Sequence, residues 1–358
     1  MRIPRRTFIQ RLAAGAHGLA SAGVAIGAPA IPGKIRTGIL GVQHSHLAGK
    51  LQAMRRHGDY ELVSAADPDP ATRAARAAGK DLEGLRWVSP DEMLADKSLH
   101  LIVFEGEVKD AIPLGRRVLE AGKHLHLEKP PTNKLEPFRD LTDLARKRNL
   151  LLQLGYLWRY HAGAEAALEA HKKGWLGDVI MIRATINSDR SPDQRAVEAR
   201  YPGGSMFELG GHMIDLVVAH LGRPTAVRHW LRHDTKIADK LADNTLAVFE
   251  YPSALATIVS SAKVTAIDQH RSFEVIGTDG SVMILPMEPA PVLRVHLREA
   301  RGPYKKGSQE IRLPAQPRFV RDFEELAKAL KSGAALKYSY DHELLLHESL
   351  LRASGEIA

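Results

Sequence analysis

A lysine at the end of an apolar segment is the first candidate for chemistry. Lys129 lies in LEKPP, residues 127–131, directly after a short run that is typical of a buried strand. Ligands of α/β sheets bind at the carboxyl ends of strands, and the two prolines make the backbone after Lys129 rigid. We therefore expect its ammonium group to face a cleft. The alternative is an ordinary solvated surface lysine, and LEKPP alone does not exclude it.

A carboxylate and an imidazole occur at helical spacing in GGSMFELGGHMID, residues 203–215. Glu208 and His212 are four positions apart on a predicted helix, so they share a face, and Asp215 lies on the same side. A carboxylate beside an imidazole can hold the ring in one tautomer as a general acid or base. The same spacing suits a metal, but there are only two ligands and no HExxH pattern, so we assign no metal here.

A third segment, GILGVQHSH at residues 38–46, begins like a dinucleotide-binding turn. An apolar strand runs into Gly41 and a helix follows, as in the G-x-G-x-x-G fingerprint. The second and third glycines of that fingerprint are replaced by Gln43 and His46, with His44 between them. A side chain at either position hinders the approach of a pyrophosphate or loosens the packing of helix on strand.

Two kinds of pattern divide the rest of the chain. Residues 34–152 alternate apolar strands with amphipathic helices, which predicts right-handed βαβ units and a Rossmann-type doubly wound parallel sheet. Residues 153–338 contain successive strands without intervening helices, which predicts an α+β domain with a large, mostly antiparallel open sheet. The fold class is therefore α/β, and residues 339–358 form a helix that is expected to pack back on the first domain.

The first thirty residues resemble a twin-arginine export signal. Arg5 and Arg6 precede Thr-Phe-Ile, a weakly apolar Ala/Gly-rich stretch follows, and residues 28–30 read Ala-Pro-Ala, a small-residue cleavage site. The apolar stretch is too short and glycine-rich for a stable membrane anchor. The expected location is periplasmic or secreted, and the alternative is a disordered basic tail.

The overall charge gives little reason to expect an acidic partner. The 358 residues carry a formal charge of +8, and half of that excess belongs to residues 1–30, which contain four arginines and no acid. With no long basic run, no nucleic acid is expected as a partner. The chain has no cysteine, which excludes disulfides, thiolate nucleophiles and cysteine-based metal sites.

Taken in order, these segments resemble one protein family. The βα turn is followed by Asp67 at the end of the second strand, then AGKHLHLEKP, GYLWRY and GGSMFELGGHMIDL, and this series is similar to the Gfo/Idh/MocA oxidoreductases over residues 34–355. The resemblance implies a Rossmann domain that binds NAD or NADP and a second domain whose open sheet mediates a homodimer or homotetramer. It also implies a site between them where a sugar or polyol hydroxyl loses a proton and a hydride.

The resemblance assigns catalytic and substrate roles to particular residues. Lys129 matches the lysine of the family's E-K-P motif, which binds the reacting hydroxyl, and His212 matches the usual acid/base. Glu208 stands where the family normally has aspartate, so its role is less defined. The predicted substrate-binding residues are Arg159, Tyr160 and Asp215.

The resemblance also implies a set of cofactor contacts. These are Gly41, Gln43, His44, Ser45, His46, Asp67, Glu128 and Lys129. A carboxylate at Asp67 would bond the adenosine ribose and repel a 2′-phosphate, which favours NAD over NADP. The alternative for Asp67 is a turn or cap residue before Pro68.

One further departure leaves two interpretations of the turn open. Most of the family has Thr-Pro-x-x-x-His where this chain has FEGEVKD, with carboxylates at Glu105 and Glu107. In the first interpretation NAD is still held, and His44 or Ser45 replaces the lost backbone contacts to phosphate. In the second, the two histidines of the turn and these carboxylates bind a divalent metal or a substrate carboxylate.

These observations predict an exported NAD(P)-dependent oxidoreductase that acts on a sugar, glycoside or polyol, with a tightly bound nicotinamide. The alternative is a redox-neutral lyase, epimerase or glycoside-cleaving enzyme on the same fold, with or without a metal. A non-catalytic sugar-binding protein is the third possibility.

Overall fold

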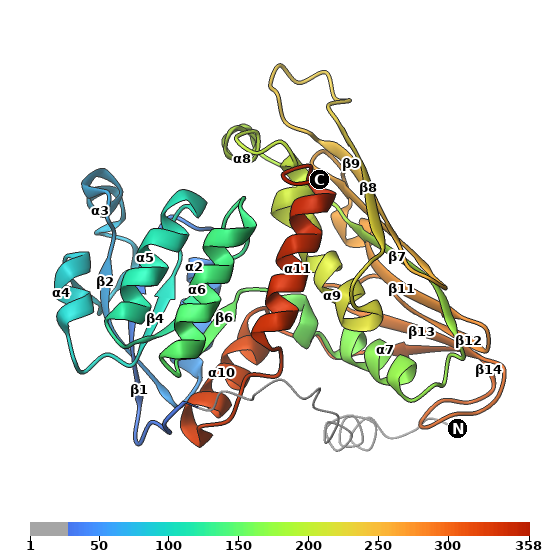
Figure 1. Cartoon of the computed structure of the whole chain (residues 1–358), viewed down its shortest axis with the longest axis horizontal. Coiled ribbons are helices and arrows are strands. Elements are labelled where there is room, and N and C mark those ends of the chain that lie inside the picture. Colours follow the sequence, from blue (N-terminus) through green and yellow to red (C-terminus); the bar gives the residue numbers. More distant parts are fainter. Residues whose placement is uncertain (1–27) are drawn as a thin grey trace.

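The computed structural model describes residues 28–358, which form two sheets side by side with helices packed between them (Figure 1). The predicted signal spans residues 1–30, and its first 27 residues lie outside the described part of the chain. Ala28 is buried, and the amide of Ile31 donates to the carbonyl oxygen of Leu330 at 2.9 Å. Among the described residues, no helix is both long and apolar enough to cross a membrane.

The first sheet is parallel throughout and has the strand order β3-β2-β1-β4-β5-β6. This is the order of a Rossmann fold, in which successive strands are added on one side of β1 up to β3 and on its other side from β4 onward. The central strands are apolar runs buried on both faces, as parallel sheets require. Its strands are β1 (Ile35–Leu40), β2 (Tyr60–Ala66), β3 (Arg86–Trp87), β4 (Leu101–Phe104), β5 (His124–Leu127) and β6 (Leu152–Leu154).

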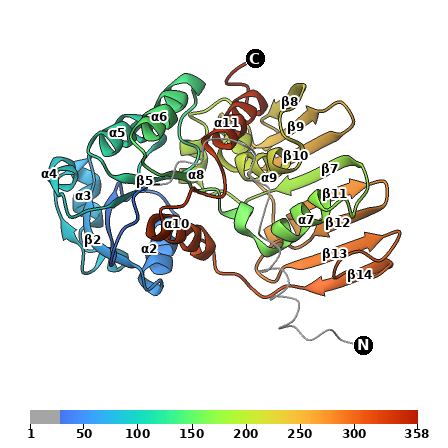
Figure 2. The same cartoon turned by 60° about the horizontal axis from the view of Figure 1, so that its bottom comes forward.

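Helices cover both faces of this sheet. Figure 2 shows α5 and α6 on one side and α2 with the later helix α10 on the other. Ser89 caps α4 in a reciprocal bond with Glu92. The helices are α2 (Leu47–Arg56), α3 (Pro70–Arg76), α4 (Pro90–Ala95), α5 (Val108–Glu120), α6 (Leu135–Lys147) and α10 (Val320–Ser332), with a 3₁₀ turn η1 (Lys80–Leu82).

The second sheet has eight strands in the order β14-β13-β12-β11-β7-β10-β9-β8. Only the β7–β10 pair is parallel among its described strands, so the predicted mostly antiparallel sheet and the α/β class are confirmed. The strands are β7 (Val179–Ile186), β8 (Ala226–Arg232), β9 (Asn244–Glu250), β10 (Leu255–Ser261), β11 (Arg271–Gly277), β12 (Gly280–Ile284), β13 (Val292–Leu297) and β14 (Gly307–Arg312).

The remaining helices lie along one face of this second sheet (Figure 1). The C-terminal helix α11 contacts α6 of the first unit and also α9 and β8 of the second, so it lies between the two sheets. The elements are η2 (Leu157–Tyr160), α7 (Ala162–Lys172), α8 (Pro192–Glu198), the π-turn η3 (Met206–Gly210), α9 (Gly211–Leu221), η4 (Ile267–His270) and α11 (Tyr340–Ala353).

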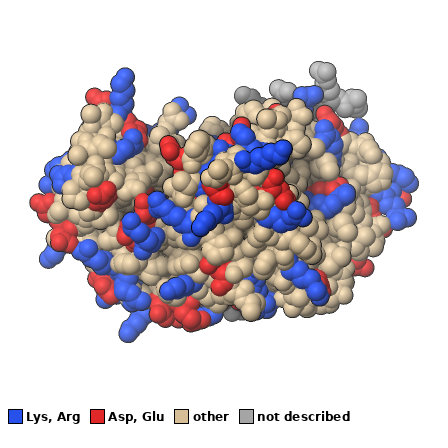
Figure 3. Space-filling view, turned by 90° about the horizontal axis from the view of Figure 1, so that it is seen from above, with Lys and Arg blue, Asp and Glu red and all other residues tan. Residues whose placement is uncertain are grey.

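Charged side chains of both signs are interspersed on the surface. Figure 3 shows lysines and arginines next to acidic residues over the face that it draws. Many of them form exposed ion pairs, such as Arg223 with Glu348 and Arg298 with Asp279. Exposed pairs of this kind contribute little to stability, so the fold rests on its apolar core.

Candidate functional site

The turn after β1 packs directly against the loop that follows β4. Gly41 has a φ of +81°, and a Cβ atom there would lie 2.4 Å from the amide nitrogen of Gly106. Glycine is therefore required at position 41 both by its conformation and by the lack of space. The first glycine of the fingerprint keeps its structural role, and the turn is fixed at the edge where β1 and β4 end.

The amides of this turn are bonded to the ends of the neighbouring strands. The Val42 amide donates to Asp67 Oδ2 at 2.9 Å, and the amides of Gln43 and His44 both donate to the carbonyl oxygen of Glu105, at 3.2 and 3.0 Å. Asp67 is buried, and burial raises the pKa of its carboxyl group while the bonds from the amides of Asp69 and Val42 lower it in part. The turn is thus positioned by β2 and β4 together.

Side chains extend from the turn where the fingerprint has its other glycines. Gln43 Nε2 donates to Thr72 Oγ1 on α3 at 3.0 Å. Ser45 is exposed, and the His46 ring lies against Phe319 with 5.1 Å between ring centroids. The turn therefore reaches α3 on one side and the start of α10 on the other.

A buried lysine lies beneath the turn. Lys50, on α2, is fully buried, and its ammonium group donates to Glu105 Oε1 and to Glu128 Oε2. Burial alone would lower the pKa of Lys50, but the two carboxylates outweigh burial and raise it. Burial raises the pKa of Glu105 to about 8 against the effect of Lys50. Glu128 has a pKa well below the ordinary value, because Lys50 and the two histidines together overcome its burial.

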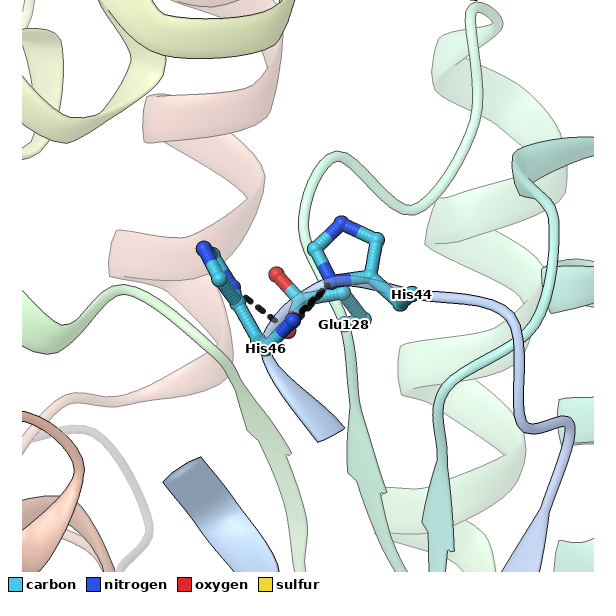
Figure 4. Close-up of side chains that lie close together, drawn as sticks. All are labelled: His44, His46 and Glu128. Atoms are coloured by element: carbon cyan, nitrogen blue, oxygen red, sulfur yellow. Dashed lines mark hydrogen bonds and ion pairs between the residues drawn. The ribbon is translucent and has the colours of Figure 1, made fainter. Parts of the chain in front are cut away.

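Two histidines and a carboxylate meet above this lysine. The carboxylate of Glu128, which follows β5, lies between the rings of His44 and His46 (Figure 4). Nδ1 of His46 is 3.2 Å and Nδ1 of His44 is 3.8 Å from Glu128 Oε2. Burial lowers the pKa of His44 to about 3 and also lowers that of His46, so both rings are neutral at pH 7. Glu107 does not join this group, because it begins α5 and pairs with Lys109 at 2.7 Å.

Lys129 is held by the backbone and the side chain of Glu208. Its Nζ donates to the Glu208 carbonyl oxygen at 2.9 Å and to Oε1 at 2.8 Å, and the lysine side chain is almost completely buried. Its amide donates to Glu128 Oε1 at 2.9 Å, so the lysine lies directly beside the histidine cluster. The sequence predicts an ammonium group that faces a cleft; in the structure Lys129 follows β5 and its ammonium group is bonded to Glu208, and its catalytic role stays a prediction.

The helix that carries Glu208 begins with a wide turn. The sequence predicts one α-helix through Glu208 and His212, but residues Met206–Gly210 form a π-turn and the α-helix begins at Gly211. A π-turn displaces the regular hydrogen-bond pattern of a helix. The Glu208 carbonyl oxygen is directed at Lys129. Glu208 therefore contributes two acceptors to Lys129, whereas a regular helix would have offered only its side chain.

His212 lies in the interior near this lysine. Its Nδ1 is buried and has no hydrogen-bond partner within residues 28–358, and its ring meets the Tyr156 ring edge-on at 5.6 Å. Burial, followed by the charge of Lys129, lowers the pKa of His212 well below its ordinary value. His212 is therefore a neutral imidazole at pH 7.

The three predicted substrate residues point elsewhere. The Arg159 guanidinium group is buried between Asp215, at 2.8 and 2.9 Å, and Glu343, at 2.5 and 3.0 Å. The Tyr160 hydroxyl accepts a bond from Gln153 Nε2 at 3.2 Å. The bonds of Arg159 join η2 to α9 and α11, and the bond of Tyr160 joins η2 to β6. The structure does not bring the three side chains to Lys129. Their role as substrate contacts stays a prediction.

One carboxylate of the site has no sequence signal. Glu198, at the end of α8, is buried beside Arg190 at 2.5 Å, and burial raises its pKa to about 7. The charges of Glu208 and Lys129 also act on it, so it belongs to the same group of ionisable residues. The segment SPDQRAVEAR is typical of an exposed helix, which is why the sequence does not predict this buried acid.

The chain matches the models of both domains of one family. Residues 35–156 match the model described as an oxidoreductase family with an NAD-binding Rossmann fold, and residues 164–283 match the GFO/IDH/MocA C-terminal domain. The predicted oxidoreductase class and the nicotinamide dinucleotide cofactor are confirmed at this level.

Relatives of known sequence match most of the chain. A dTDP-3,4-didehydro-2,6-dideoxy-alpha-D-glucose 3-reductase from Streptomyces violaceoruber is 27% identical over 306 residues, which cover 83% of this chain and 85% of the relative. A trans-1,2-dihydrobenzene-1,2-diol dehydrogenase from Macaca fascicularis is 25% identical over 317 residues and covers 86% of each chain.

Solved structures share the fold. A 3-ketoreductase from Actinomadura kijaniata, in complex with TDP-benzene and NADP, has a TM-score of 0.72 and 18% identity and covers 89% of this chain and 96% of that one. An oxidoreductase from Agrobacterium radiobacter, in complex with NAD+, L-tartaric acid and magnesium, has a TM-score of 0.75 and 13% identity, covering 90% and 96%.

The first prediction concerns the buried lysine. We expect Lys50→Met to lower the free energy of unfolding by about 3–5 kcal/mol, because it leaves two buried carboxylates without their cation. The measurement is urea unfolding followed by circular dichroism. Adding Glu105→Gln to Lys50→Met removes one of those carboxylates and should restore part of the loss.

The control is Lys109→Met, which removes an exposed lysine that pairs with Glu107. It should leave the unfolding midpoint unchanged. If Lys50→Met unfolds at the same urea concentration as this control, the ion pairs of Lys50 do not stabilise the fold.

Proposed function

Because the chain belongs to the Gfo/Idh/MocA family of oxidoreductases, we propose that it transfers a hydride between a CH–OH group of a sugar, glycoside or polyol and a tightly bound NAD(P). The observation that carries this proposal is the pair formed by Lys129 and the neutral His212. Both lie where β5 ends, next to the turn after β1. Ligands of doubly wound sheets bind at this edge.

The residues at this edge of the sheet can contact the phosphates and the ribose of a dinucleotide. The ten-residue helix α2 begins just after the turn, so its amides and dipole favour a phosphate. Gly41 keeps the conformation of the fingerprint, and Asp67 is held at the end of β2, where a carboxylate can bond a ribose hydroxyl. Asp67 favours NAD over NADP by repelling a 2′-phosphate.

Two positions of the turn must act differently from the fingerprint. Gln43 and His46 carry side chains where glycine allows close backbone approach, and two amides of the turn already donate to Glu105. The side chains of His44 and Ser45, which are part-buried and exposed, would then supply bonds to phosphate. Glu128 and Lys129 would lie toward the nicotinamide end.

The protein groups supply the proton chemistry. Bound nicotinamide would accept or return the hydride. Lys129, held by Glu208, donates a hydrogen bond to the reacting oxygen and stabilises the negative charge that develops on it. His212 accepts the proton of the hydroxyl, since its imidazole is neutral.

A sugar or polyol is the substrate class that these groups favour. The reacting oxygen would meet an ammonium and an imidazole, while Glu208 and Glu198 offer carboxylate oxygens to neighbouring hydroxyls. The Streptomyces violaceoruber relative is named as a reductase of a nucleotide-linked deoxysugar, which supports this class.

A redox-neutral reaction is the second candidate. The observation that favours it is the cluster of His44, His46 and Glu128, whose residue types suit a divalent metal as well as a phosphate. A lyase, epimerase or glycoside-cleaving enzyme of this kind would lose its activity with a chelator and would not respond to added NAD.

The second prediction tests the catalytic pair. Lys129→Met and His212→Asn should each lower kcat by about 100-fold or more, because each removes a group that moves or stabilises charge at the reacting oxygen. The assay is the change in nicotinamide absorbance over a panel of sugars and polyols, with bound nucleotide measured after denaturation. His229→Asn, at an exposed histidine on β8, is the control.

Full activity in both variants would contradict the proposed roles. Purified protein that contains no nucleotide and binds none would contradict the oxidoreductase proposal itself.

The third prediction concerns export. We propose that residues 1–30 direct the folded, cofactor-loaded protein through the twin-arginine route. Replacing Arg5 and Arg6 by lysine should retain the protein in the cytoplasmic fraction, whereas Arg11→Lys should leave its export unchanged. Immunoblots of cell fractions make the measurement, and equal export of both variants would contradict the route.

The fourth prediction concerns a homodimer. Helices cover one face of the second sheet, and apolar side chains are exposed on its strands, including Trp230 (50% exposed) and Leu255 (44%). We propose that a second copy of the chain covers this outer face. A Trp230→Lys/Leu255→Lys variant should elute as a monomer in light-scattering chromatography, whereas Val197→Lys, at an exposed position of α8 outside the sheet, should not change the mass. A monomeric unmodified chain would contradict the proposal.

A further inference from the structure

The histidine cluster has the composition of a metal site. His44 and His46 come from the turn after β1, and Glu128 comes from the end of β5 (Figure 4). One ligand atom from each of the three lies within 4.8 Å of the others. The two imidazoles are on opposite sides of one carboxylate, and their rings meet edge-on with 4.5 Å between centroids. Small side-chain rotations would bring all three ligand atoms to bonding distance of one ion.

Two neutral imidazoles and one carboxylate are a recurring ligand set. Three protein ligands with this composition hold catalytic zinc and non-haem iron, and they leave positions open for water or substrate. Both histidines are only part-buried, so the cluster is reached from solvent. A fully enclosed structural zinc site would need four protein ligands.

A fourth side chain points at the cluster without a partner. Glu105 is completely buried, and its Oε2 has no hydrogen-bond partner among residues 28–358. This oxygen lies 3.7 Å from Nδ1 of His44, while Oε1 of the same carboxylate accepts a bond from Lys50. A buried carboxylate oxygen without a donor is costly, and a cation at the cluster would satisfy it.

The acidic side chains beneath the cluster outnumber the buried cation. Two of them, Glu105 and Glu128, share the single ammonium group of Lys50. The other nearby cation, Lys129, is already paired with Glu208. Lys50 donates to Oε2 of Glu128, the oxygen that faces both histidines, so an ion at the cluster takes over that oxygen while Lys50 keeps its bond to Glu105.

We propose that His44, His46 and Glu128 bind one divalent transition-metal ion, such as Zn²⁺ or Mn²⁺, with Glu105 at its edge. The ion lies next to the proposed catalytic lysine, because the Lys129 amide donates to the other oxygen of Glu128. From there it can polarise an oxygen of a bound sugar as a Lewis acid. This inference does not rest on the hydride transfer proposed above. With His44 bound to the ion, the phosphate contacts of the turn would come from Ser45 and the amides at the start of α2.

The fifth prediction is metal binding by the full chain. Protein purified without chelator should contain about one equivalent of Zn²⁺ or Mn²⁺ by mass spectrometry of the elements. After the metal is stripped with a chelator, calorimetric titration with ZnCl₂ or MnCl₂ should show one site. His44→Asn and His46→Asn should each weaken it by more than about 100-fold, because even loss of an outer-shell partner costs about 10- to 100-fold.

Matched controls separate this result from misfolding and from nucleotide binding. His270→Asn changes an exposed histidine far along the chain and should keep the affinity of the unmodified protein. Circular dichroism verifies that each variant is folded, and NAD binding is measured on the same samples. Absence of metal from the folded, unmodified chain, or equal metal affinity in His44→Asn and His270→Asn, would overturn the proposal whatever the NAD result.

Discussion

The ammonium group of Lys50, buried between Glu105 and Glu128, is the interaction on which the site depends. It joins α2 to the ends of β4 and β5, three elements far apart in the chain. A buried ion pair adds little net stability to a protein, but removing one partner strongly destabilises the fold. The pairs of Lys50 therefore restrict how α2, β4 and β5 are arranged more than they stabilise the protein. By fixing the carboxylate of Glu128, it also fixes the position of Lys129, the next residue along the chain.

Around the ion pairs of Lys50, the site combines ionised groups with neutral imidazoles. Burial keeps His44, His46 and His212 uncharged at pH 7, while Lys129 stays paired with Glu208. An uncharged imidazole can accept a proton or bind a metal, and an adjacent ammonium group can stabilise an oxyanion. The same edge of the sheet therefore offers groups for hydride-transfer chemistry and for Lewis-acid chemistry. The family to which the chain belongs supports the first, and the histidine cluster of this chain supports the second.

The sequence predicted the fold because each element has a strong local pattern. The apolar run LIVF and the alternation of strands and helices identify a parallel sheet, and Gly41 marks a turn that only glycine can form. The apolar run before Lys129 forms β5, which ends two residues before this lysine, as the sequence pattern indicates. The π-turn before α9 was not predicted, because the apolar and polar pattern of the segment fits a regular helix, and the bond from Lys129 to the Glu208 carbonyl oxygen joins residues 79 positions apart.

Thus the sequence alone determined the order of the elements, the Rossmann-type domain, the antiparallel sheet and the candidates Lys129 and His212. Tertiary structure decided which charges meet. It placed Glu105 inward and Glu107 outward, brought Glu128 between two histidines, and buried Glu198 in a segment with an exposed pattern. The physical reason is that the periodicity of apolar residues indicates only which face of its own helix or strand a residue occupies. Charge compensation in the interior is set by side chains from separate elements, and only the assembled fold brings these together.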